Sequence, residues 1–85
     1  LRELSYMLYL DSENIPWEPA EKKIYEIKYI NWDGKDRTYR PDFIVNENTL
    51  VEVKPKRLHN TPNILEKTKA AEEFCKLNNL TYQII

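Results

Sequence analysis

Two neighbouring stretches, Arg40-Pro-Asp-Phe-Ile-Val45 and Leu50-Val-Glu-Val-Lys54, decide how this chain folds. Both are short and rich in β-branched or aromatic residues, which predicts a strand for each. Residues 46–48 between them read Asn-Glu-Asn and predict a tight turn. We therefore expect the two stretches to lie side by side as an antiparallel pair.

The pairing predicts a cluster of charged side chains on one face of the sheet. Side chains alternate along a strand, so Glu52 and Lys54 point the same way. Val51 and Val53 point to the opposite face and supply the core. The turn folds the strands together and can bring Asp42 beside Glu52. Two carboxylates and one ammonium would then share a face.

This combination of groups suits metal-assisted chemistry at a phosphate. Converging carboxylates repel each other, and a divalent cation such as Mg²⁺ or Mn²⁺ resolves that repulsion through hard oxygen ligands. Such a cation activates water, and Lys54 would stabilise charge at the phosphate or help to position and deprotonate the water. The alternative is a set of solvated polar residues with a cross-strand ion pair. The coincidence of two patterns on adjacent strands favours the metal site.

The rest of the chain predicts an α/β fold. Three predicted strands in a meander, then a helix and a last strand, imply a mixed four-stranded sheet flanked by helices, in the order αβββαβ. The expected elements are a helix over residues 1–11, strands over 23–31, 37–45 and 50–54, a helix over 62–78 and a strand over 81–85.

Length and composition narrow the class of protein. The 85 residues form a single domain, and a net charge of -1 excludes a globally basic nucleic-acid wrapper. One cysteine excludes a disulfide framework and a cysteine-based zinc site. The absence of a long apolar run and of a secretory signal predicts a cytoplasmic protein without a membrane segment. The chain begins at Leu1, within a helical pattern, so we expect a truncated N-terminus.

Several charged residues outside the central pair have two interpretations each. Glu3 lies at the edge of the apolar arc of its helix, where it either covers the core or reaches a cation. Lys67 falls inside the apolar arc of the second helix and either snorkels or reaches the acidic site or a DNA phosphate. Arg40 contacts phosphate or pairs with an acid. Lys56 and Arg57 either hold a phosphate backbone or belong to an ordinary polar loop.

The pattern Pro41-Asp42, nine residues, then Glu52-Val53-Lys54 resembles the PD-(D/E)XK nuclease superfamily, with its restriction-endonuclease-like αβββαβ core. Within it, the chain looks most like TnsA-type transposon-end nucleases and related small endonucleases of tailed phages. The shared features are Glu3 with Asp11, Trp17-Glu18-Pro-Ala-Glu21, Tyr39 to Phe43, Glu52 to Lys56, and Lys67 with Cys75.

The resemblance implies a role for each matching residue. Asp42 and Glu52 would be metal ligands, and the carbonyl group of Val53 would complete the metal shell. Lys54 would be the catalytic lysine, and Glu3 the first-helix acid that also serves the metal.

The resemblance implies a Mg²⁺-dependent DNA endonuclease in which Mn²⁺ can substitute. It also implies a protein of a phage or mobile element that acts in the cytoplasm, which for a phage protein is the cytoplasm of the host. So small a domain has little surface for reading a DNA sequence, so we expect a homodimer or a targeting partner. The alternatives are a Holliday-junction resolvase of the same superfamily and a catalytically silent DNA-binding or assembly module.

Overall fold

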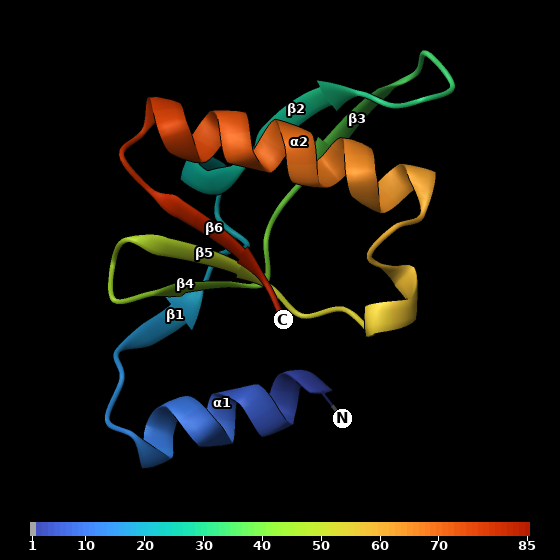
Figure 1. Ribbon diagram of the computed structural model, residues 1–85. Coiled ribbons are helices and arrows are strands. Elements are labelled where there is room, and N and C mark those ends of the chain that lie inside the picture. The colour runs from blue at the N-terminus through green and yellow to red at the C-terminus, as the bar shows by residue number, and fades with distance from the viewer. Residues whose placement is uncertain (1) are drawn as a thin grey trace.

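The computed structural model describes residues 2–85, except for the side chains of Arg2 and Lys56 (Figure 1). The elements are α1 (Arg2–Ser12), β1 (Trp17–Pro19), the short 3-10 helix η1 (Lys23–Tyr25), β2 (Ile27–Ile30), β3 (Asp36–Tyr39), β4 (Phe43–Val45), β5 (Thr49–Glu52), the 3-10 helix η2 (Lys56–Leu58), α2 (Pro62–Leu77) and β6 (Thr81–Ile84). Strands β1 to β5 lie between the two α-helices in the chain, and a last strand, β6, follows the second helix.

The central sheet is mixed and has the strand order β1-β4-β5-β6. Strand β4 pairs antiparallel with β1 and β5, whereas β5 and β6 are parallel. A parallel pair needs a crossover connection, and α2 provides it. The predicted fold class, a mixed four-stranded sheet flanked by helices, is therefore confirmed.

The sheet forms a middle layer between the two helices, with α1 on one side and α2 on the other (Figure 1). On the α1 side, Leu10 packs with Phe43, Val45 and Val51. The ring of Trp17 meets that of Phe43 edge to face, with 5.4 Å between the centroids. This face is the apolar core that the alternation of Val51 and Val53 predicted.

The opposite face of β4 and β5 is also covered. Ile44 and Leu50 pack there with Ala20 and with Cys75 of α2. Strands buried on both faces read as continuous apolar runs, which is what β4 and most of β5 show. The face that the sequence predicted to be charged at alternate positions is thus mostly apolar, and Glu52 is only 5% exposed on it.

One predicted strand, residues 37–45, is two strands in the structure. Strand β3 belongs to a separate two-stranded sheet with β2, and β4 belongs to the central sheet. The chain crosses between the sheets at Arg40, Pro41 and Asp42. Proline has no N–H group to donate, so it interrupts a ladder at this point, and Pro41 is fully buried there.

The first strand of the central sheet also differs from the prediction. Its edge is β1, which begins directly after Pro16, ends at Pro19 and was not predicted. The predicted strand 23–31 starts only at Ile27, after η1, and pairs with β3 outside the central sheet. A short edge strand tolerates proline because it needs fewer ladder bonds, but the two prolines hide its strand pattern.

No helix within residues 2–85 is long and apolar enough to cross a lipid bilayer.

Candidate active site

The end of β5 sets the positions of Glu52 and Lys54. Beyond the strand, the N–H of Ile85 donates to the carbonyl oxygen of Glu52 at 2.9 Å, and the N–H of Lys54 donates to that of Ile85 at 3.0 Å. The backbone therefore stays extended past Glu52. Nζ of Lys54 lies 3.2 Å from Oε2 of Glu52, so the two side chains point the same way, as alternation predicted.

Asp42 is fixed against the other edge of β5 by both its backbone and its side chain. Its N–H donates to the carbonyl oxygen of Val51 at 3.1 Å, and the N–H of Val53 donates to its Oδ2 at 2.9 Å. The kink at Pro41 frees Asp42 from β3 and lets its carboxylate turn toward β5. The structure thus brings Asp42, Glu52 and Lys54 together.

The surroundings of Glu52 disfavour its negative charge. Burial is the largest cause that raises the pKa of Glu52 above its ordinary value of 4.5, and the nearby charge of Asp42 adds to it. Hydrogen bonds from Tyr39 and Lys54 act in the opposite direction but do not cancel the effect. A further positive charge at this point would stabilise both carboxylates.

Two tyrosines complete the surroundings of Glu52. The hydroxyl group of Tyr39 donates to Oε1 of Glu52 at 2.6 Å, and the hydroxyl groups of Tyr39 and Tyr82 lie 2.8 Å apart. Burial raises the pKa of both phenols well above 10, so they remain protonated. Tyr39 begins the stretch Tyr39 to Phe43 that resembles the nuclease family, but the sequence predicted no role for it. Its place three residues before Asp42 is the only sequence signal that it carried.

Lys67 reaches the same group of residues from α2. Its Nζ lies 5.3 Å from the centroid of the Tyr39 ring, a cation–π contact. Its ammonium group therefore lies beside the tyrosine that holds Glu52. Its predicted role as a DNA ligand stays a prediction.

Two of the other predicted DNA-binding residues, Arg40 and Arg57, lie at the surface. Arg40 donates from Nη2 to Oε2 of Glu26 at 2.6 Å, and this hydrogen bond lowers the pKa of Glu26. The structure therefore shows Arg40 paired with an acid, which is one of the two roles that the sequence allowed for it. Arg57 is exposed on η2, and the side chain of Lys56 lies outside the described residues.

Glu3 is not brought to the pair. It is exposed in the first turn of α1. Among the described residues, no three histidine, cysteine, aspartate or glutamate side chains group closely enough to hold a metal ion. The assignment of Glu3 as a metal ligand stays a prediction, and the geometry of the described residues gives it no support.

The remaining donors fit a hard divalent cation. Mg²⁺ is commonly held by one or two carboxylates and keeps several of its waters, so Asp42 and Glu52 suffice as side-chain ligands. The carbonyl group of Val53 belongs to the residue whose N–H already binds Asp42, which places a third oxygen on the same backbone segment. The crowding of negative charge around Glu52 is the electrostatic condition that a cation relieves.

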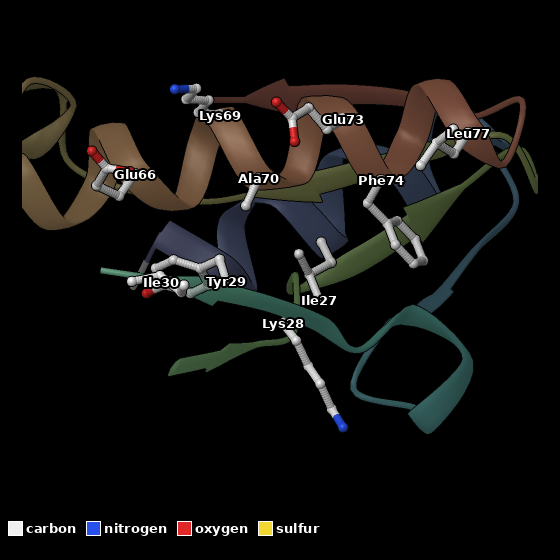
Figure 2. Close-up of a pocket in the computed structure, with 10 residues that line it drawn as sticks. All are labelled: Ile27, Lys28, Tyr29, Ile30, Glu66, Lys69, Ala70, Glu73, Phe74 and Leu77. Atoms are coloured by element: carbon white, nitrogen blue, oxygen red, sulfur yellow. The ribbon is translucent and has the colours of Figure 1, made fainter. Parts of the chain in front are cut away.

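A separate groove lies between α2 and β2, with a volume of about 460 Å³ (Figure 2). Ile27, Ala70 and Phe74 form its apolar floor, and Lys28 and Glu73 lie among its charged lining residues. Neither Asp42 nor Glu52 lines it. The acidic pair therefore lies at the end of β5, apart from this groove.

Comparison with known families supports the family resemblance that the sequence shows. The family described as the N-terminal domain of TnsA-like endonucleases matches residues 11–85, which include Asp42, Glu52 and Lys54 but not Glu3. Comparisons with curated proteins and with solved structures give no match. Because the family match spans nearly the whole chain, the protein belongs to the TnsA-like endonuclease N-terminal domain family.

Proposed function

We propose that this domain is the catalytic core of a Mg²⁺-dependent DNA endonuclease. The observation that carries the proposal is the convergence of Asp42 and Glu52 beside Lys54, in a chain whose family is one of endonucleases. When bound, the cation would activate water and neutralise charge at the scissile phosphate.

The protein's own residues would orient and balance this chemistry. Asp42 is held by a backbone hydrogen bond to Val51 and by one from the N–H of Val53 to its carboxylate, so the carboxylate is oriented without a metal. Lys54 is half-buried beside Glu52 and can stabilise negative charge that develops on a phosphate oxygen. Lys54 would therefore stabilise charge on the phosphate, and Asp42 and Glu52 would bind the metal.

DNA recognition would begin next to this site. Lys56 and Arg57 follow Lys54 after Pro55. The ring Nε2 of His59 lies 2.9 Å from the carbonyl oxygen of Lys54, which ties the basic loop to the segment that follows β5. In this proposal, the loop would bind a phosphate backbone. A specific DNA interface buries roughly 1,000–2,500 Å² of protein, so a second copy or a targeting partner would supply the remaining surface.

The test is cleavage of supercoiled plasmid and of a four-way DNA junction in Mg²⁺ and in Mn²⁺. We expect the chain to nick plasmid, Asp42→Asn to be inactive, and Lys54→Ala to lose about 100-fold or more in rate. Asp36→Asn, an exposed acid on β3 changed in the same way, is the matched control and should cut normally.

A folded, metal-loaded chain that cuts neither substrate would contradict the proposal and favour a DNA-binding module. Cleavage confined to the four-way junction would favour a resolvase instead. Equal cutting by Asp42→Asn would show that the acidic pair is not the active site.

A further inference from the structure

The hydroxyl groups around Glu52 form a directed chain of hydrogen bonds. An ionised carboxylate only accepts hydrogen bonds, so Tyr39 must give its single hydroxyl proton to Oε1 of Glu52. The contact between the two tyrosine hydroxyl groups then has one direction, with Tyr82 as the donor and Tyr39 as the acceptor. The order is Tyr82, Tyr39, Glu52, and each bond polarises the next.

Tyr39 is held in place from both its backbone and its ring. Its backbone pairs with Ile27 in the two-stranded sheet, and its ring packs with Ile27 and Ala71 of α2. Lys67 contacts the ring from α2. Only 5% of Tyr39 is exposed. Its hydroxyl group is therefore a fixed donor, presented to β5 from a different sheet.

Glu52 is consequently fixed through both of its oxygens. Tyr39 binds Oε1 at 2.6 Å, and Lys54 binds Oε2 at 3.2 Å. Lys54 has a long, flexible side chain and is partly exposed, whereas Tyr39 is not. The orientation of the carboxylate is therefore determined mainly by Tyr39.

We propose that Tyr39, supported by Tyr82, is a positioning residue that holds the carboxylate of Glu52 in the orientation required to bind the divalent cation. The proposal rests on the proposed function, because it concerns the same metal. Partners that orient metal ligands typically contribute roughly ten- to a hundredfold to metal affinity.

The test measures the dissociation constant of Mn²⁺ by calorimetry and the melting temperature without metal, for the whole chain and three Tyr→Phe variants. Tyr39→Phe keeps the ring and its packing but removes the donor, and we expect it to weaken Mn²⁺ binding by roughly ten- to a hundredfold. Tyr82→Phe leaves the bond to Glu52 in place and should cause a smaller loss. Tyr29→Phe is the matched control, since Tyr29 packs against the same cluster as Tyr39 and should bind Mn²⁺ as the unchanged chain does.

The outcomes separate this proposal from the proposed function. Unchanged Mn²⁺ affinity in Tyr39→Phe, while Asp42→Asn abolishes binding, overturns the positioning role and leaves the metal site intact. An equal loss in Tyr29→Phe also overturns it, because a loss common to both variants reflects the core. No Mn²⁺ binding by the unchanged chain overturns both proposals. If Tyr39→Phe does not fold, Tyr82→Phe decides: a loss of affinity at an unchanged melting temperature supports the role, and unchanged affinity overturns it.

Discussion

At the scale of single residues, the buried carboxylate of Glu52 lowers the stability of the folded chain when it is ionised. Its side chain is buried, its charge lies near that of Asp42, and its pKa is raised in the folded chain. The unfolded chain releases the Glu52 proton near pH 4.5, whereas the folded chain retains it to a higher pH. As the pH rises between these two values, the folded state binds more protons than the unfolded state, so stability falls.

Glu52→Gln should therefore stabilise the metal-free chain at about pH 8. The neutral amide removes the cost of a buried charge, and we expect a gain of about 1 kcal/mol, or roughly 4–8 °C in melting temperature. The difference should shrink as the pH approaches the ordinary pKa of a glutamate. Thermal denaturation in EDTA across this range measures it. A Glu52→Gln variant that melts below the unchanged chain at about pH 8 would show that the buried charge of Glu52 does not destabilise the fold.

Part of the site follows from local sequence rules. The alternation of side chains along one strand placed Glu52 and Lys54 together, and a single turn was enough to place Asp42 near them. Tyr39 was not predictable in the same way, because it lies in the other sheet. Its approach to Glu52 depends on how the two sheets meet, which no local pattern describes.

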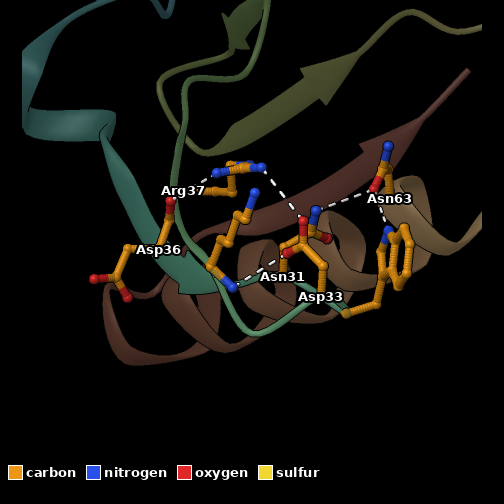
Figure 3. A network of polar contacts seen from close by, with 7 residues as sticks. Asn31, Asp33, Asp36, Arg37 and Asn63 are labelled. Carbon is orange, nitrogen blue, oxygen red and sulfur yellow. Dashed lines mark hydrogen bonds and ion pairs between the residues drawn. The ribbon is translucent and has the colours of Figure 1, made fainter.

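At the scale of elements, the hairpin of β2 and β3 is tied to the start of α2. The carboxamide oxygen of Asn63 accepts hydrogen bonds from Nδ2 of Asn31 at 3.1 Å and from Nε1 of Trp32 at 2.6 Å (Figure 3). Asn31 is only 8% exposed, so its side chain needs this partner. The contact joins residues more than thirty positions apart and fixes the hairpin on the helix.

Asn63→Ala should loosen this junction. The substitution leaves the buried side chain of Asn31 without its partner, which typically costs about 1–3 kcal/mol. We expect a lower melting temperature and a change in tryptophan fluorescence, with Mn²⁺ affinity unchanged because the junction lies at the far end of the hairpin from Tyr39. Asn60→Ala, an exposed asparagine in the preceding loop, is the control. Equal stability of the two variants would show that the junction contributes nothing.

The helices were more predictable than the strands. Their apolar residues repeat at helical spacing over many positions, and the observed bounds of α1 and α2 agree with the expected ones to within one or two residues. Strand β1 has three residues, too few to show a period. The break between β3 and β4 falls at Pro41. The sequence pattern indicated this proline as part of a catalytic motif, and its interruption of the strand was not predicted.

At the scale of the whole molecule, the acidic pair lies where three structural units meet. The central sheet supplies Glu52 and Lys54, the crossing segment supplies Asp42, and the two-stranded sheet supplies Tyr39. The helix α2 packs on both sheets and adds Lys67 and the apolar cover. Residues from both sheets and from α2 therefore meet around Glu52.

The proposed function requires Asp42 and Glu52 to hold a divalent cation. Calorimetric titration with Mn²⁺ tests it most directly, on the unchanged chain, Asp42→Asn, Glu52→Gln and the control Asp36→Asn. We predict heat of binding in the unchanged chain and the control, and its loss in both site variants at temperatures where all four chains are folded. The absence of binding in the unchanged chain, or equal binding by Asp42→Asn, would contradict the claim.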